Sequence, residues 1–542
     1  MTLPSVLDPF FAIARSDPDR PAVVDNGATV GYAQLARWAG AVADLLATRA
    51  AGGPRPPVGV VAHHGVRDIA ALLGVLTAGR GYVPVADGPP GHAEAALRAV
   101  GCRELVATAE NGDLPAVDRV VRPNWGRSGA PVREAGEPVR ADDPAYVLFT
   151  SGSTGAPKAA SVPHGALHAV LPHLRERYGV GPDTVALNFH RADGDTSLEE
   201  ILPTLLSGGL VVLDEDGEAD LDRVLTEHEV TLVNLPVDYW HLYTGHLLDA
   251  GRELPRTIET VVIGGEAVRP DMLERWHRLG ADRAVLLNTY GSTETALVTH
   301  TAVLAGPGAP ADFPAGVPIG RPLPSVRQAV VALPETPAGT GELWLSGAQL
   351  ATGYRDDPGR TAARFVAADL GGGTDRWYRT GDLVAEAPDG SLVFHGRVDH
   401  QVKIRGHRVD LLDVEEALRR LPGVSAAAAA EHTKHARTEH AHTTLTAFVV
   451  LTPGAAARPD TPTDDGADAG TGDGADAGTD AGTDAAADDA ADTGADDGAA
   501  LRARLREVVP APLVPDVIVV VPALAHTRTG KVDRAATRDR YL

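Results

Sequence analysis

Apolar positions along the chain follow two spacings, and each spacing predicts one kind of element. Between residues 31 and 46, apolar side chains recur every three or four positions, which predicts an amphipathic helix, and residues 69–78 predict a second helix. Short apolar runs at 59–62, 81–85 and 146–149 predict buried strands. Strands that alternate with helices predict an α/β fold built on doubly wound, largely parallel sheets.

The second half of the chain predicts more strands and then a change of architecture. Residues 231–236 and 261–267 predict strands that end in loops, and ligands of such sheets bind at the carboxyl ends of the strands. Residues 341–347 and 351–354 predict a strand and a turn of a mostly β subdomain. We therefore expect the binding sites at the strand ends that precede this subdomain.

Length and composition narrow the class of protein. A chain of 542 residues is too long for one compact core, so two or more domains are expected. No stretch approaches the ~18 apolar residues of a membrane span, and the N-terminus lacks the basic region of a secretory signal. The single cysteine, Cys102, excludes an internal disulfide framework. These features predict a cytoplasmic protein with no membrane partner.

Most of the net charge of −24 lies in one segment. Residues 460–497 contain 13 Asp and neither Lys nor Arg, so the rest of the chain carries −11. That balance argues against nucleic acid as a partner. Residues 455–500 consist almost only of Asp, Ala, Gly and Thr, and have too few apolar groups to offset the entropy of ordering. They predict a disordered insertion with no catalytic role.

A loop rich in glycine and hydroxyl groups follows the predicted strand at 146–149. Residues 150–155 contain two each of Gly, Ser and Thr, and Lys158, one of four lysines in a chain that otherwise uses arginine, comes soon after. Glycine lets backbone N–H groups converge on a ligand, so such a loop can wrap polyphosphate oxygens with the lysine as a point charge. The spacing is not that of a Walker A loop. A flexible surface loop is the alternative interpretation.

Several segments resemble the signature motifs of the adenylate-forming enzymes. Residues 148–158 resemble the phosphate-binding motif, and more narrowly that of the amino-acid-activating adenylation domains of nonribosomal peptide synthetases. The segments at 288–294, 378–383, 396–410 and 526–533 resemble the adenine, ribose, hinge and C-terminal lysine motifs of the same family. The resemblance covers essentially the whole chain outside the acidic insertion.

The resemblance implies a division into domains. Residues 1–396 are expected to form a large N-terminal domain of doubly wound sheets with a β subdomain. A hinge at 397–400, which pivots at Asp399, leads to a small, mobile α+β domain at 401–542. Because no carrier or condensation domain is recognised beside these, the resemblance implies a free-standing adenylation enzyme.

The family's reaction uses ATP and Mg²⁺, and its motifs imply roles for the matching residues. Tyr290 stacks on adenine, Asp382 accepts hydrogen bonds from the ribose hydroxyls, and Glu294 holds Mg²⁺, which prefers carboxylate oxygen. The implied catalytic residues are Lys531, Glu294 and Thr150, with Lys531 stabilising charge as a carboxylate attacks the α-phosphate. The implied ATP-binding set is Thr150, Ser151, Gly152, Ser153, Thr154, Gly155, Lys158, Gly265, Glu266, Asn288, Thr289, Tyr290, Gly291, Thr293, Asp382 and Arg397.

The resemblance also implies a substrate pocket. Its set is Asp195, Thr196, Glu199, Asn234, Val262, Gly264, Thr289, Leu297, Val298 and Lys531. Asp195 matches the family residue that holds the α-amino group of the substrate, although Gly194 stands where the family commonly has Phe. Gly264 is expected to leave room for a long chain, and Asn234 to accept a hydrogen bond.

Two acidic positions suggest which amino acid binds. Asp195 and Glu199 are spaced i, i+4, so on a helix they share a face with Cβ atoms roughly 5–6 Å apart, and two like charges there are unfavourable unless cations separate them. A diamino acid brings one ammonium for each carboxylate, so we expect lysine, β-lysine or ornithine. Glu200 would face elsewhere. The alternatives are that Glu199 is a solvated helix residue, or that Asp195 holds a β-amino group.

The implied partners are the amino acid, a phosphopantetheine-bearing carrier protein in trans and, as in some relatives, an MbtH-like helper. Two other functions compete with this one: an acyl- or aryl-CoA ligase of the same superfamily, and a non-catalytic adenylate-binding or scaffold protein. Asp195 argues against the first, because its carboxylate would be unpaired beside an acyl chain. The second would be expected to have lost at least one of Lys158, Glu294, Asp382 and Lys531.

Overall fold

The computed structural model of the chain describes most of its residues. They are 1–47, 55–86, 91–109, 117–126, 131–150, 158–215, 217, 220–334, 339–398, 401–404, 407–435, 441–452, 489–526 and 532–542. These divide into two compact units, with the division between Arg408 and Val409, later than the domain end predicted at residue 396. Each unit is considered by itself. Asp399, the predicted pivot, lies outside the described residues, so its role stays a prediction.

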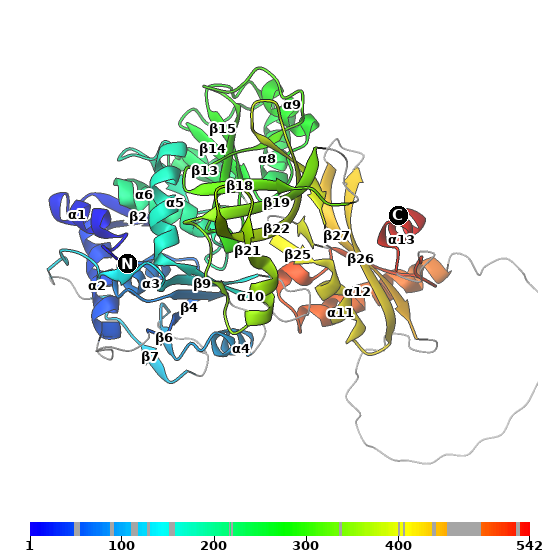
Figure 1. Cartoon of the computed structure of the whole chain (residues 1–542), viewed down its shortest axis with the longest axis horizontal. Coiled ribbons are helices and arrows are strands. Elements are labelled where there is room, and N and C mark those ends of the chain that lie inside the picture. The colour runs from blue at the N-terminus through cyan, green and yellow to red at the C-terminus, as the bar shows by residue number, and fades with distance from the viewer. Residues whose placement is uncertain are drawn as a thin grey trace, which may run out of the picture. The chain divides into compact units, whose positions relative to one another are not determined.

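The first unit contains a sheet whose described strands run in the order β20-β10-β9-β5-β4-β6-β7. Their bounds are Gly353–Tyr354 (β20), Lys158–Pro163 (β10), Pro144–Thr150 (β9), Tyr82–Ala86 (β5), Val58–Ala62 (β4), Glu104–Val106 (β6) and Arg119–Val121 (β7). Figure 1 labels β9, β4, β6 and β7 of this sheet. The pairs from β9 through β7 are parallel, whereas β10 is antiparallel to both its neighbours. All five residues of β4 are buried, as expected for a parallel strand covered on both faces.

A second sheet of the same unit runs in the order β18-β19-β22-β23-β17-β16-β15-β14-β13-β11-β12-β2-β3, with β21 beside β22. Its strands are Val326–Val331 (β18), Thr340–Gly347 (β19), Thr374–Glu386 (β22), Leu392–Arg397 (β23), Pro318–Pro322 (β17), His300–Ala305 (β16), Val285–Tyr290 (β15), Thr260–Gly264 (β14), Leu232–Pro236 (β13), Val185–Leu187 (β11), Leu210–Leu213 (β12), Pro21–Asp25 (β2), Ala28–Gly31 (β3) and Phe365–Asp369 (β21). The pairs from β15 to β2 are parallel, and those from β15 to β18 are antiparallel. The sheet therefore joins a doubly wound half to the predicted β subdomain.

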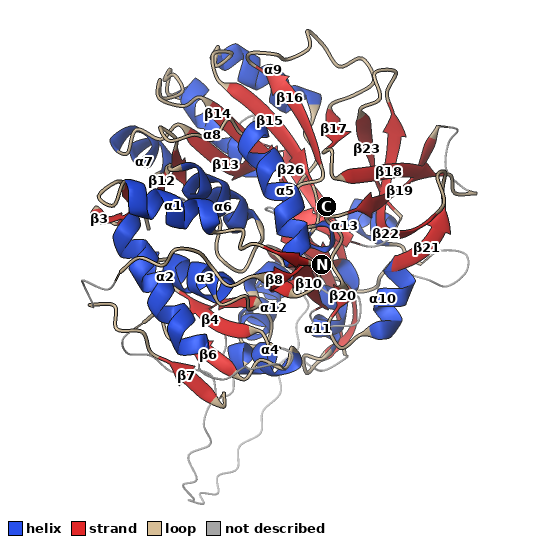
Figure 2. Ribbon diagram, turned by 60° about the vertical axis from the view of Figure 1, so that its left-hand side comes forward, coloured by secondary structure: helices blue, strands red, loops and turns tan. Residues whose placement is uncertain are grey.

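Helices cover both faces of this parallel half (Figures 1 and 2). The helices of the unit are Asp8–Ser16 (α1), Tyr32–Ala47 (α2), Val66–Thr77 (α3), His92–Ala99 (α4), His164–Arg177 (α5), Thr196–Ser207 (α6), Leu221–Glu227 (α7), Val237–Asp249 (α8), Pro270–Leu279 (α9) and Pro358–Arg364 (α10), with a 3₁₀ turn at Thr293–Thr295 (η1). On β12, Val211 packs in the core formed with α5 and α6, while its neighbour Val212 packs in the core formed with α8 and α9. Alternate side chains thus fill opposite layers, which confirms the predicted doubly wound α/β class.

The second unit is a small α+β assembly. Its elements are Leu411–Arg419 (α11), Val424–His435 (β26), Ala441–Leu451 (β27), Asp489–Arg506 (α12), Ala511–Leu513 (η2), Val517–Val520 (β28) and Arg534–Tyr541 (α13). Two short strands earlier in the chain, Gln401–Ile404 (β24) and His407–Asp410 (β25), form a sheet of their own. The order β26-β27-β28 brings a parallel pair beside an antiparallel one. Arg534 donates from Nε and Nη2 to both carboxylate oxygens of buried Glu415, at 2.6 and 2.8 Å, which ties α13 to α11.

The prediction that residues 455–500 form a disordered insertion is wrong for residues 489–500. Residues 489–500 lie in α12, and the backbone of Gly498 packs so closely that a Cβ there would lie 2.2 Å from Ile518 O. Leu501 and Leu505 of the same helix are buried at i, i+4 spacing, so packing of its C-terminal half supports the helix. Residues 453–488 lie outside the described residues.

Within the described ranges, no helix combines the length and apolar character that crossing a membrane requires.

Candidate functional site

Three side chains of the predicted site meet where β15 and β23 end beside an inner residue of β22. Asp382 and Arg397 are cross-strand partners, and Nη1 of Arg397 donates to Oδ1 of Asp382. The Tyr290 hydroxyl donates to Oδ2 of the same carboxylate at 2.5 Å. Burial and then the charge of Asp382 raise the pKa of Tyr290. Both oxygens of Asp382 are thus held in a fixed orientation beside an aromatic ring.

Glu294 lies in the turn η1 that directly follows this strand end. Its side chain is buried, and the Tyr354 hydroxyl donates to its Oε1 at 2.7 Å. Ala351 N donates to the Glu294 carbonyl at 2.9 Å, so the loop before β20 holds the turn through its backbone, and Tyr354 on β20 holds it through a side chain. The carboxylate predicted to bind a metal is therefore positioned by Tyr354, which sequence reasoning assigned only to a turn. Thr293, also predicted, is the first residue of η1.

Asn288 and Gly291 shape the end of β15. Nδ2 of Asn288 donates to Pro318 O at 2.8 Å, whereas its Oδ1 is buried without a hydrogen-bond partner among the described residues. A Cβ on Gly291 would lie 1.9 Å from Leu297 O, so only glycine lets the chain pass this close to the returning segment. The strand end thus presents an unsatisfied buried acceptor next to a tightly packed turn.

The neighbouring end of β14 is packed closely against β15. A Cβ on Gly264 would lie 2.4 Å from Oγ1 of Thr289 on β15, so this contact requires glycine, and the expected room for a long substrate chain stays a prediction. Gly265 has φ of +85°, and the carboxylate of Glu266 accepts a hydrogen bond from Asp238 N at the start of α8, at 3.2 Å. These residues fix the loop after β14.

The predicted phosphate loop is described only at its two ends. Thr150 and Lys158 are cross-strand partners on β9 and β10, and the Lys158 side chain is buried. Ser151, Gly152, Ser153, Thr154 and Gly155 lie outside the described residues, as does Lys531, so their roles stay predictions.

The acidic pair predicted for the substrate lies at the start of α6. Asp195 is the N-cap residue, and Glu199 in the first turn is 5% exposed. Oε2 of Glu199 accepts from the Tyr178 hydroxyl at 2.8 Å and from Nδ2 of Asn234 at 3.4 Å. Burial, and then the charge of Asp195, raise the pKa of Glu199 well above its ordinary value. The alternative that Glu199 is a solvated helix residue is wrong.

Two tyrosines near this pair were missed from the sequence. Tyr178 is the C-cap of α5, and Tyr146 lies on β9; neither position carries a local sequence signal for the site. Burial, then the charges of Asp195 and Glu199, raise the pKa of Tyr146, so its phenol lies near both carboxylates. The Tyr146 hydroxyl is buried without a hydrogen-bond partner among the described residues. The region therefore combines acidic groups with an unsatisfied donor.

The other predicted pocket residues line the same strand edge. Asn234 on β13 pairs in register with Val262 on β14, and Gly264 pairs with Thr289 on β15. Leu297 and Val298 are buried in the core cluster that includes Val262. Thr196 is half-buried at the first position of α6.

Comparison with known proteins identifies what this arrangement is. A family model described as AMP-binding enzyme matches residues 10–355, more than half of the chain. The chain belongs to this family of AMP-binding enzymes. The prediction of an adenylate-forming enzyme is thereby confirmed.

Relatives of this AMP-binding enzyme include very long chains. It is 35% identical to a phenyloxazoline synthase, MbtB, of Mycobacterium sp. (strain MCS), over 98% of this chain and 41% of the relative. It is 35% identical to an isonitrile lipopeptide synthase of Streptomyces coeruleorubidus, over 95% of this chain and 32% of the relative. The chain thus spans less than half the length of these relatives.

One similar solved structure is holo-PA1221 bound to a vinylsulfonamide inhibitor, with a TM-score of 0.77 and 26% identity to this enzyme. Holo-PA1221 is a nonribosomal peptide synthetase protein that contains adenylation and PCP domains. That match covers 99% of this chain and 84% of the other. The fold and the adenylation-domain type predicted from the motifs agree with it.

Proposed function

We propose that this enzyme uses ATP to activate a diamino acid, namely lysine, β-lysine or ornithine, as its aminoacyl adenylate, and then transfers the aminoacyl group to a carrier-protein thiol. The observation that carries the proposal is Glu199: a buried carboxylate, held by Tyr178 and Asn234, four residues after Asp195. A buried carboxylate next to another is costly unless a cation offsets it. The second ammonium group of a diamino acid is such a cation.

Activation forms a bond between a substrate carboxylate oxygen and the α-phosphorus of ATP, while the bond from that phosphorus to the bridging oxygen breaks and pyrophosphate leaves. In the proposal, Asp195 holds the amino group next to the carboxylate and Glu199 holds the distal ammonium, which orients the attacking oxygen. In the second step the carrier thiol attacks the acyl carbon, the C–S bond forms, AMP leaves and the thiol proton is lost. The PCP domain of holo-PA1221 supports this choice of partner.

Residues on the nucleotide side fit ATP. The buried Oδ1 of Asn288 is an acceptor suited to the amino group of adenine, and the oriented carboxylate of Asp382 suits two ribose hydroxyls. Glu294 offers a hard oxygen ligand for Mg²⁺, which supplies charge neutralisation on the phosphates when bound. Lys158, Thr150 and Lys531 are assigned by motif to the phosphates and the transition state.

The direct test is amino-acid-dependent ATP–pyrophosphate exchange across lysine, β-lysine, ornithine, diaminobutyrate, arginine and neutral or aromatic controls, with and without an MbtH-like helper. Exchange with a diamino acid supports the proposal. Preference for leucine or an aromatic amino acid would overturn the substrate but keep the reaction. Exchange only with acids that lack an amine would favour the acyl- or aryl-CoA ligase, and exchange with none would favour a non-catalytic adenylate-binding protein.

Substrate binding is expected to release a proton. In the free enzyme the raised pKa of Glu199 keeps its carboxyl protonated at pH values where an ordinary Glu is ionised, because burial, Asp195 and Glu200 all oppose its charge. An ammonium group beside it favours the ionised form, so binding lowers that pKa. Affinity for the diamino acid therefore rises with pH until the pH exceeds the pKa in the free enzyme.

Titration calorimetry in two buffers of different ionisation enthalpy measures this release. Up to one proton per substrate is expected for the wild type, and this release is expected to be lost in Glu199→Gln. Equal proton release by both proteins would contradict the assignment of Glu199 to the distal ammonium.

A further inference from the structure

One buried carboxylate joins the first part of the loop that leads into Asp195 to the helix that follows the loop. Glu200, 2% exposed, lies one position after Glu199 on α6 but has different partners. Its Oε1 lies 2.7 Å from Nδ1 of His190, and its Oε2 accepts from His190 N at 3.2 Å and from Nδ2 of Asn188 at 2.5 Å. The same Asn188 amide donates to Oγ of Ser197 at 3.1 Å. Glu200 therefore connects the beginning of the loop to the helix that follows it.

This loop runs from the end of β11 at Leu187 to Thr196, the first residue of α6. Inside it, Gly194 N donates to Arg191 O at 3.2 Å, which closes a turn directly before Asp195. Asn188 N donates to Val212 O at 2.9 Å, which joins the loop start to the sheet. The bonds of Glu200 in the first part of the loop and the turn at Gly194 together hold Asp195 at the start of α6.

We propose that His190 is a positioning residue that, through Glu200, fixes the loop and aims Asp195 at the substrate amino group nearest the reacting carboxylate. The inference rests on the role of Asp195 in the proposed function. Nδ1 of His190 must carry a hydrogen to donate to Oε1 of Glu200. This bond satisfies a buried oxygen of Glu200, since the backbone N–H of His190 donates to the other oxygen, Oε2. Without it the loop gains freedom, and small displacements of a substrate-orienting group reduce rate strongly.

The test compares His190→Leu with His190→Asn. Leucine removes the donor, whereas the asparagine amide places an N–H where Nδ1 lies. The readout is the ratio of kcat/KM in ATP–pyrophosphate exchange for lysine to that for 6-aminohexanoate, which lacks the amino group held by Asp195. We expect His190→Leu to lower this ratio about tenfold with the KM for ATP unchanged, and His190→Asn to stay within about twofold of wild type.

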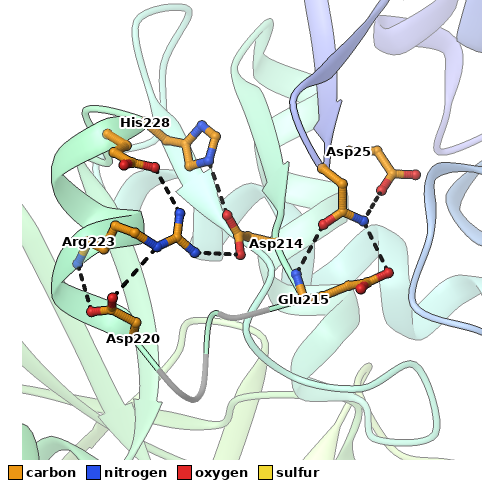
Figure 3. A network of polar contacts seen from close by, with 8 residues as sticks. Asp25, Asp214, Glu215, Asp220, Arg223 and His228 are labelled. Atoms are coloured by element: carbon orange, nitrogen blue, oxygen red, sulfur yellow. Dashed lines mark hydrogen bonds and ion pairs between the residues drawn. The ribbon is translucent and has the colours of Figure 1, made fainter.

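A matched control comes from a second histidine of the same unit. Nε2 of His228 lies 3.3 Å from Oδ2 of Asp214, whose other oxygen pairs with Arg223 (Figure 3). The side chains of His228 and His190 are 18% and 21% exposed. His228→Leu removes a comparable histidine–carboxylate contact elsewhere, and we expect it to leave the ratio unchanged.

Three results would overturn the proposal. One is an unchanged ratio in a folded His190→Leu enzyme, one is an equal loss in His228→Leu, and one is a loss in His190→Asn as large as in His190→Leu. Should the wild type activate a different amino acid, the proposed substrate is wrong, and the ratio is then measured for that amino acid against its deaminated analogue. Should the wild type activate acids without an amine equally well, Asp195 holds no amine and both proposals fail.

Discussion

Replacing Glu199 with Gln is expected to lower the preference for lysine over norleucine by about a hundredfold. Norleucine has an apolar chain of similar length, so the ratio of the two kcat/KM values isolates the contact with the distal ammonium. Glutamine keeps the shape and the hydrogen bonds to Tyr178 and Asn234 but not the charge. Removing one partner of a buried ion pair costs about 3 kcal/mol, which corresponds to the expected change of about a hundredfold in the lysine-to-norleucine ratio. ATP–pyrophosphate exchange measures it.

Glu415→Gln is the matched control for this variant. Glu415 is also a buried carboxylate with a strong partner, Arg534, but it belongs to the second unit. We expect this variant to lower the stability of its own unit and to leave the lysine-to-norleucine ratio unchanged. A ratio that stays at the wild-type value in Glu199→Gln would remove the charge of Glu199 from substrate selection.

The second large effect is expected at Asp382. In the wild type, the Tyr290 hydroxyl and the Arg397 guanidinium each donate to one carboxylate oxygen of Asp382. In Asp382→Asn, an NH₂ group replaces one of these oxygens, so one of the two donors faces another donor and loses its acceptor. The side chains of Asp382 and Arg397 are 9% and 8% exposed, so the cation keeps little water. Breaking this pair is expected to lower the unfolding free energy of the first unit by about 3 kcal/mol and to raise the KM for ATP strongly. Denaturant unfolding and exchange kinetics measure the two effects.

An exposed pair between β17 and the turn that joins β22 to β23 serves as its control. Asp389 pairs with Arg321 at 3.4 Å, with both side chains mostly exposed. Because solvent screens such pairs, Asp389→Asn is expected to change neither stability nor the KM for ATP measurably. An Asp382→Asn enzyme that matches this control in both measurements would show that the buried cluster neither stabilises the unit nor contributes to binding ATP.

Residues within motifs could be predicted because a motif fixes both identity and spacing. Tyr290, Asp382 and Arg397 come from three separate segments, and the structure brings their side chains into contact. The hydrophobic spacing also predicted elements well: the helix expected at 31–46 is α2, Tyr32–Ala47. The charge of Asp195 acts on Glu199, whereas Glu200 has other partners, as the i, i+4 argument expected; the roles of Asp195 and Glu199 in binding substrate stay predictions.

What sequence reasoning missed depends on contacts between distant segments. Tyr178 reaches Glu199 only because the end of α5 lies beside α6, and Tyr354 reaches Glu294 from 60 positions away. Neither tyrosine has a local pattern that distinguishes it. The contact of Gly264 with Thr289 could not be predicted for the same reason, because Thr289 belongs to the neighbouring strand.

We propose that this enzyme forms a diaminoacyl adenylate, and a competition among carboxylic acids shows which adenylate it forms. The enzyme is incubated with ATP, Mg²⁺, hydroxylamine and an equimolar mixture of the proteinogenic amino acids with ornithine, β-lysine and salicylate, and mass spectrometry identifies the hydroxamates formed. We predict that the hydroxamate of lysine, β-lysine or ornithine dominates. A dominant hydroxamate of a neutral amino acid or of salicylate would contradict the claim.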